Sequence, residues 1–216
     1  MASNKMLLVG GGGHCHSVMD SLLQIFPSVE LGIIGRPNEK GKIILGVPVV
    51  GCDEDLVRLY RDGWDQAVIA IGSIGDSTNR KRLFHTIKEI GFFMPPIIDP
   101  TVVIAANCKV AAGIFAGKGA VINAGAEVGE GAIINTGSIV EHDCKVGAFS
   151  HVSPGAVLCG NVSIEEGAHV GAGSVVIQGV SIGRDSMIGA GSVVIRDIPP
   201  EVIAYGNPCS VVRNKV

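Results

Sequence analysis

Apolar residues recur with a period of six along the second half of the chain. From Ile104 to Val194, the sixteen positions spaced six apart are all large aliphatic residues except Ala116. Four residues after each lies a second position, and twelve of these sixteen are Ala, Ser or Cys. This pattern predicts a parallel β-helix with three short faces per coil, in which aliphatic side chains fill the interior and small residues let the corners close. Sixteen such units make about five coils, and Ile98 with Val102 adds one more unit.

The first 95 residues have a different pattern, in which strands alternate with helices. Apolar runs predict strands over 6–9, 29–34 and 66–71, and helical spacing predicts helices over 14–26, 54–60 and 78–90. Asp53 is the expected N-cap of the middle helix, and residues 37–42 form a polar loop. The alternation predicts an α/β fold with a small, Rossmann-like parallel sheet.

Prolines mark the change from one pattern to the other, at Pro95, Pro96 and Pro100. We therefore expect a Rossmann-like domain over residues 1–96 and a β-helix over 97–198. The tail over 199–216 leaves the six-residue period.

Composition narrows the function classes. The net charge of −3 gives no basic footprint for nucleic acid, and no apolar run approaches the ~18 residues of a membrane span. Lys5 is followed by only four apolar residues before Gly10, so we expect no signal peptide. The six cysteines form no Cys-x-x-Cys pair, which favours reduced thiols over a disulfide framework. These features predict a cytoplasmic protein.

The segment Glu141-His142-Asp143 is the sharpest candidate for chemistry. His142 lies two residues after the interior position Val140, hence off the interior and near a corner. A neutral imidazole near pH 7 can take a proton from an attacking amine or hydroxyl, and Asp143 could fix its tautomer. The alternative is an exposed histidine on a polar corner.

Two further histidines, His151 and His169, are eighteen residues apart and therefore stack on successive coils. Pointing outward, they line a ligand groove or form a surface ladder. Zinc-binding β-helix enzymes of the gamma carbonic anhydrase type use a His-x-x-x-x-His segment. No pair of histidines here has that spacing, so we expect no metal site.

A run of four glycines, from Gly10 through Gly11, Gly12 and Gly13, follows the first strand and opens a helix at His14. Glycines there let a phosphate approach backbone N–H groups at the helix N-terminus. Neither the dinucleotide fingerprint nor a P-loop is complete, so a tight turn without a ligand remains the alternative. Ile71-Gly72-Ser73, at the end of the third strand, could wall the same crevice.

The motifs occur in one order along essentially the whole chain. They are the Gly-Gly-Gly-Gly-His run, Ala70-Ile71-Gly72, Asn135-Thr136, Glu141-His142-Asp143-Cys144, Phe149-Ser150-His151-Val152-Ser153-Pro154-Gly155 and Gly206-Asn207-Pro208. Together they resemble the sialic acid O-acetyltransferase family and its close relatives, the nucleotide-linked amino-sugar N-acetyltransferases. The resemblance implies that the β-helix is left-handed and that the chain forms a homotrimer with active sites between adjacent helices.

The resemblance also assigns expected roles to residues of this chain. It makes His142 the catalytic base with Asp143, acetyl-CoA the co-substrate and a nucleotide sugar the ligand of the N-terminal domain. The expected contacts of acetyl-CoA are His151, Gly160 and Ala172. The expected contacts of the sugar substrate are Gly11, Gly12, Gly13, His14, Arg36, Gly72, Ser73, Asn123 and Asn135.

Two departures from the family pattern leave the nucleotide open. Relatives that bind UDP often carry acidic residues just after the second strand, where this chain has Ile34-Gly35-Arg36-Pro37. Cys15 replaces the usual glycine after His14. We expect N-acetylation of a nucleotide-linked 4-amino-4,6-dideoxy sugar. The alternatives are O-acetylation of sialic acid or another sugar, and a non-catalytic scaffold in a sugar pathway, which has no need for a carboxylate-flanked histidine.

Overall fold

The structure is a computed structural model that describes residues 4–215. It divides into two compact units. The α/β unit comprises the chain up to Gly72 together with Thr78–Ile97, and the β-helix unit comprises Ser73–Ser77 together with the chain from Ile98 onward. The short segment Ser73–Ser77, which connects two elements of the α/β unit, therefore belongs with the β-helix.

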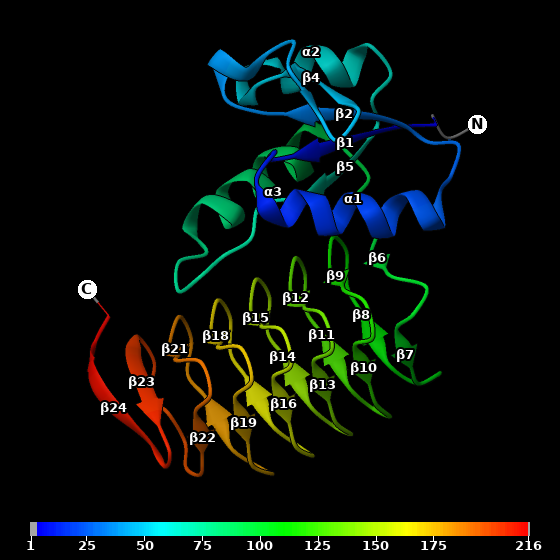
Figure 1. The fold of residues 1–216 in the computed structure, drawn as a ribbon. Coiled ribbons are helices and arrows are strands. Elements are labelled where there is room, and N and C mark those ends of the chain that lie inside the picture. The colour runs from blue at the N-terminus through cyan, green and yellow to red at the C-terminus, as the bar shows by residue number, and fades with distance from the viewer. Residues whose placement is uncertain (1–3, 216) are drawn as a thin grey trace. The chain divides into compact units, whose positions relative to one another are not determined.

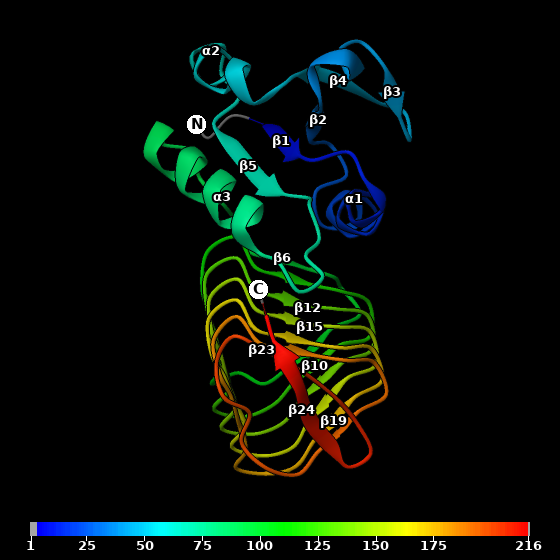
Figure 2. The same ribbon diagram turned by 90° about the vertical axis from the view of Figure 1, so that its left-hand side faces the viewer.

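The α/β unit is built on a five-stranded sheet in the order β3-β4-β2-β1-β5, parallel except for the β3–β4 pair. Figures 1 and 2 show α1 and α2 on opposite faces of this sheet. The elements are β1 (Lys5–Val9), α1 (Gly13–Ile25), β2 (Glu30–Ile34), the 3-10 turn η1 (Pro37–Glu39), β3 (Ile43–Ile44), β4 (Val47–Gly51), the 3-10 turn η2 (Asp53–Asp55), α2 (Leu56–Arg61), β5 (Gln66–Ile69) and α3 (Thr78–Ile90). The Rossmann-like parallel sheet expected from the alternation of strands and helices is confirmed.

Two local features of this unit differ from the expectation. Asp53 is not the N-cap of α2, because it opens the preceding 3-10 turn and Asp55 takes the cap position. The Asp55 carboxylate accepts a hydrogen bond from the Cys52 backbone N–H at 3.1 Å, which fixes the turn. The β3–β4 hairpin was not predicted. Its two-residue turn uses Leu45 and Gly46, both with positive φ, and Leu45 is not a residue type that announces such a turn.

The β-helix has three parallel faces built from two-residue strands. One face has the order β22-β19-β16-β13-β10-β7, a second β20-β17-β14-β11-β8, and a third β24-β23-β21-β18-β15-β12-β9-β6. Each strand pairs with the strand eighteen residues later, as in the pairing of His151 with His169. Figure 1 shows the coils stacked in order, and Figure 2 looks along them.

The strand bounds of the β-helix follow the six-residue period closely. They are β6 (Ile97–Ile98), β7 (Val103–Ile104), β8 (Lys109–Val110), β9 (Phe115–Ala116), β10 (Val121–Ile122), β11 (Glu127–Val128), β12 (Ile133–Ile134), β13 (Ile139–Val140), β14 (Lys145–Val146), β15 (His151–Val152), β16 (Val157–Leu158), β17 (Ser163–Ile164), β18 (His169–Val170), β19 (Val175–Val176), β20 (Ser181–Ile182), β21 (Met187–Ile188) and β22 (Val193–Val194). The tail forms the hairpin of β23 (Val202–Gly206) and β24 (Cys209–Asn214), and β23 continues the third face beside β21.

Aliphatic side chains of the period fill the interior of the coils. Ile104 is an exception at 38% exposure, because its strand β7 ends its face and no earlier coil covers it. The small interior residues do more than save space. Ser150 and Ser186, for example, are fully buried, and their hydroxyls donate to the backbone carbonyl oxygens of Glu165 and Pro199 at 2.8 and 2.7 Å. They thereby satisfy carbonyl groups that would otherwise be costly to bury.

Candidate active site

His142 lies at the corner that follows β13, where the chain turns from one face of the β-helix to the next. Its imidazole Nδ1 is 2.9 Å from Asp143 Oδ2, and the histidine and aspartate side chains are 61% and 66% exposed. Because a carboxylate can only accept, Nδ1 carries the proton and Nε2 is left as a lone-pair acceptor. The carboxylate of Asp143 raises the pKa of His142 chiefly through this hydrogen bond. The pair therefore has the tautomer and basicity that a general base requires.

The backbone at this corner is in a left-handed conformation that most other corners assign to glycine. Asp143 has φ +60°, whereas the equivalent positions Gly125, Gly137 and Gly155 are glycines with φ between +63° and +74°. A non-glycine residue pays a strain cost there, although Asp is one of the more tolerant types. The strained backbone brings the Asp143 carboxylate to the His142 ring.

The neighbouring coils support this corner from both sides. One coil earlier, Asn123 Nδ2 donates to Glu141 Oε2 at 3.1 Å, and the same oxygen accepts the backbone N–H of His142 at 3.2 Å. One coil later, the imidazole lies directly against Gly160. A β-carbon added to Gly160 would stand 2.5 Å from His142 Nε2 and 2.6 Å from Cε1. The ring position of His142 therefore depends on the absence of a side chain at residue 160.

His151 is buried rather than open to solvent, with only 7% of its surface exposed. Its Nδ1 lies 2.6 Å from the backbone carbonyl oxygen of Ser73, and its Nε2 lies 3.1 Å from Asn135 Nδ2. A carbonyl oxygen accepts and an amide NH₂ donates, so both ring nitrogens have defined roles. His151 and Asn135 thus hold the segment Ser73–Ser77 on the third face of the β-helix.

His169 stacks on His151 one coil later, with ring centroids 5.0 Å apart and an edge-to-face angle of 89°. Its Nε2 lies 3.2 Å from Ser153 Oγ. Burial lowers the pKa of His169 to about 4, and the adjacent His151 ring acts in the same direction. Of the two interpretations open from sequence, the surface ladder is wrong, since both histidines are buried, and the ligand groove stays a prediction.

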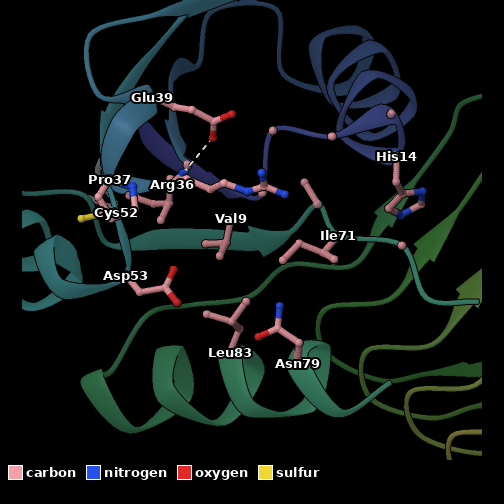
Figure 3. Close-up of a pocket in the computed structure, with 18 of the residues that line it drawn as sticks. Val9, His14, Arg36, Pro37, Glu39, Cys52, Asp53, Ile71, Asn79 and Leu83 are labelled. Atoms are coloured by element: carbon pink, nitrogen blue, oxygen red, sulfur yellow. Dashed lines mark hydrogen bonds between the residues drawn. The ribbon is translucent and has the colours of Figure 1, made fainter. Parts of the chain in front are cut away.

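The α/β unit contains a cavity of about 560 Å³ at the carboxyl ends of its parallel strands (Figure 3). Such edges are where open α/β sheets bind ligands. Of the residues expected to contact the sugar substrate, the cavity brings together Gly11, Gly12, Gly13, His14, Arg36 and Gly72. Ser73 does not line it and is instead held by His151. Asn123 and Asn135 support corners and side chains of the β-helix, as described above.

The glycine run supplies the first helical turn of α1 without any side-chain cap. Gly12 is the N-cap residue and has no side chain to cap the helix, and no acidic residue follows in the first turn. Uncapped N–H groups at a helix start favour an anionic ligand. A β-carbon at Gly12 or Gly13 would meet nothing within 4 Å, so the backbone here is open to an incoming group.

Sequence reasoning missed the polar residues at the other end of the cavity. They are Glu39, Cys52, Asp53, Glu54 and Asn79. Glu39 Oε2 accepts the Arg36 backbone N–H at 2.9 Å, and Figure 3 shows the Arg36 side chain extending along the cavity. A hydrogen bond with Cys52 lowers the pKa of Glu54. Asp53 and Glu54 follow β4. Had this strand been predicted, its carboxyl end would have placed both residues at the ligand-binding edge of the sheet.

Among the residues that the structure describes, no group of three His, Cys, Asp or Glu side chains is placed to hold a metal ion. No helix within residues 4–215 is long and apolar enough to cross a membrane. Ala172, one of the residues expected to contact acetyl-CoA, lies exposed at a corner of the β-helix, where its carbonyl accepts the Gly191 N–H at 2.8 Å.

Comparisons with known proteins agree with both parts of this architecture. Residues 5–87 match the family model of the PglD N-terminal domain, and residues 161–196 match the bacterial transferase hexapeptide model, which comprises six repeats. No curated protein sequence matches the chain at a significant level.

Solved structures of acetyltransferases resemble the whole chain. PerB from Caulobacter crescentus, in complex with CoA and GDP-perosamine, is 38% identical over 96% of this chain and 97% of its own, with a TM-score of 0.89. A histidine-to-alanine variant of GDP-perosamine N-acetyltransferase from the same organism, with the same two ligands, is 36% identical over 97% of each chain, with a TM-score of 0.91. The acetyltransferase domain of PglB from Neisseria gonorrhoeae, in complex with acetyl-CoA, is 29% identical over 97% of this chain and all of its own, with a TM-score of 0.90.

Proposed function

Because this chain belongs to the family of PglD-like, hexapeptide-repeat sugar N-acetyltransferases, we propose that it acetylates the amino group of a 4-amino-4,6-dideoxy sugar carried on GDP. Acetyl-CoA is the donor. The Caulobacter transferases bind GDP-perosamine, which favours this type of acceptor over a free sugar.

The observation that carries the proposal is the His142–Asp143 pair, with Nδ1 2.9 Å from the carboxylate and Nε2 left as the acceptor. The sugar amine attacks the thioester carbonyl of acetyl-CoA, and Nε2 of His142 takes the proton that leaves the nitrogen. Asp143 stabilises the resulting imidazolium. As the carbon–sulfur bond breaks, the imidazolium returns the proton to the departing CoA thiolate.

The substrates are assigned to different parts of the chain. The glycine run at the start of α1 receives the diphosphate, with Arg36 as a nearby cation in the same cavity. Gly160 and Ala172 contact acetyl-CoA from corners of the β-helix. His151 was also expected to contact acetyl-CoA, yet its two nitrogens are engaged by Ser73 and Asn135. In this arrangement His151 therefore does not donate a hydrogen bond to the thioester oxygen of acetyl-CoA.

We further propose a homotrimer in the cytoplasm, where acetyl-CoA and nucleotide sugars are made. Ile177 and Ile195 favour self-association, because they occupy equivalent corners on successive coils and are 38% and 41% exposed. Light scattering at micromolar concentration should give three times the chain mass, and a monomer mass would reject this assembly.

The enzymatic proposal is tested by measuring release of CoA thiol with a panel of acceptors. The panel contains GDP-, UDP- and dTDP-linked 4-amino sugars and free sialic acid. We expect the wild-type chain to acetylate the GDP-linked amine. We expect the rate in His142→Ala to be lower by about 10²–10⁴-fold. Preferred turnover of sialic acid would favour O-acetylation, and no turnover of any acceptor would favour a scaffold.

A further inference from the structure

Arg82 of α3 joins two polar residues that line the cavity of the α/β unit. Its Nη2 atom donates to Asp53 Oδ2 at 2.9 Å and to Asn79 Oδ1 at 2.9 Å. Asp53 follows strand β4, and Asn79 is in the first turn of α3. Figure 3 shows the two side chains on either side of Leu83, along the part of the cavity that α3 lines.

The arginine decides which groups this pair presents to a ligand. A guanidinium has only donors, so it must face the oxygen of the Asn79 amide rather than its NH₂ group. The Asn79 amide nitrogen is therefore left to donate elsewhere. On Asp53 the arginine takes one lone pair of Oδ2. Each carboxylate oxygen has two lone pairs, so both oxygens can still accept from a ligand. The result is a carboxylate acceptor and an amide donor that are both linked to one nitrogen atom of Arg82.

The nucleobases differ in how well they complement this pair. Guanine presents two adjacent donors, N1–H and the N2 amino group, next to the O6 acceptor. A carboxylate accepts from both donors at once, while an amide NH₂ reaches O6. In uracil and thymine a single N–H lies between two carbonyl oxygens, which repel a carboxylate. Adenine and cytosine present an unprotonated ring nitrogen next to their amino group, which also opposes a carboxylate.

The surroundings of the pair favour the same base. Glu54, next in the chain, also lines the cavity and adds a second carboxylate beside Asp53, which favours a base that presents donors. Val9 and Leu83 supply apolar walls for a flat ring. Two residues after β2 the chain has Arg36 rather than an acid, and Glu39 of the same loop accepts the Arg36 backbone N–H. The other two carboxylates of this cavity, Asp53 and Glu54, come from the loop after β4.

We infer that Asp53 is the residue that selects guanine in the nucleotide-sugar substrate, with Asn79 donating to O6 and Arg82 positioning both side chains. The inference rests on the proposed function, since it assigns the base of the same substrate. It adds a specificity-determining residue that lies far along the chain from the His142 corner.

The test measures nucleotide binding by calorimetry with GDP, UDP and XDP, without acetyl transfer. Xanthine has an oxygen where guanine has the N2 amino group, so an amide complements it and a carboxylate does not. The wild-type chain should bind GDP at least tenfold more tightly than UDP or XDP. Asp53→Asn should lose about 10- to 100-fold in GDP affinity and prefer XDP. Asp62→Asn is the matched control, because Asp62 does not line the cavity and should leave all three affinities unchanged.

A second variant, Arg82→Gln, separates positioning from folding. It should lower the GDP-over-XDP preference while the melting temperature stays within a few degrees, and Arg82→Lys should restore part of the preference. Unchanged GDP selectivity in Asp53→Asn, or equal wild-type affinity for GDP and UDP, would overturn the inference. If the wild type still acetylates a GDP-linked amine in that case, only the role of Asp53 is wrong. If no nucleotide-linked amine is acetylated, the proposed function itself is wrong.

Discussion

Gly160→Ala is the sharpest test of how the β-helix positions the base. The added β-carbon would lie 2.5 Å from His142 Nε2, 2.6 Å from Cε1 and 3.2 Å from Cδ2. Each of these separations is below ordinary van der Waals contact of about 3.5–4.0 Å, so the ring must move. The backbone of Gly160 is not in the left-handed region, and Ala fits it without strain.

The cost should appear in catalysis and not in stability. The His142 side chain is 61% exposed, so it can turn away into solvent without disturbing the core. Turning away breaks the 2.9 Å contact with Asp143 and removes Nε2 from its place. A misplacement of about 1 Å costs on the order of 10²-fold, and complete loss of a general base costs about 10²–10⁴-fold. We expect kcat to fall by about 10²-fold, with the melting temperature nearly unchanged.

The assay is steady-state release of CoA thiol, with thermal unfolding measured in parallel. The double variant Gly160→Ala/His142→Ala separates an effect on the ring from a direct contact with acetyl-CoA. If Gly160→Ala acts through His142, it should change neither the residual rate nor the acetyl-CoA Michaelis constant of His142→Ala. More than half of the wild-type kcat in Gly160→Ala alone would refute the reasoning.

Three other outcomes follow from the structure. Asp143→Gly should relieve the strain at φ +60° and stabilise the fold by about 1 kcal/mol. The acid limb of its kcat–pH profile should move to lower pH, because the carboxylate no longer raises the pKa of His142. Asp185→Gly, at φ +53°, is the matched control that relieves strain without touching His142, and an unmoved acid limb in Asp143→Gly would count against the role of Asp143. Burial lowers the pKa of His169 to about 4 in the folded chain, against about 6.5 in the unfolded chain. The free energy of unfolding should therefore fall by up to roughly 1.4 kcal/mol per pH unit as the pH drops from about 6.5 to about 4. His169→Leu should flatten this decline in urea titrations, and an unchanged slope would contradict the prediction. Gly12→Val should raise the Michaelis constant of the nucleotide sugar, because the added side chain enters the space proposed for the diphosphate. The Michaelis constant of acetyl-CoA and the fold should be unchanged, since nothing of the chain lies within 4 Å of the added β-carbon. The reverse pattern would place the sugar site elsewhere.

Short-range patterns determined much of this protein in advance. The six-residue period alone specified the β-helix, because stacking repeats buries one aliphatic row per face and fixes the eighteen-residue register. The alternation of strands and helices specified the parallel sheet. The adjacency of His142 and Asp143 already indicated a base with a carboxylate partner, since neighbouring residues at a corner can reach each other.

Contacts between residues far apart in sequence were decided only by tertiary structure. The burial of His151 depends on Ser73, 78 residues earlier, and no periodicity predicts that the segment Ser73–Ser77 lies on the β-helix. Asp53 and Asn79 come together because strand order brings β4 and α3 to one cavity, and Arg82 then bridges them. Local sequence encodes periodic burial, whereas which loops meet at a sheet edge depends on the packing of whole elements, and this is why the residues proposed to select the base were missed.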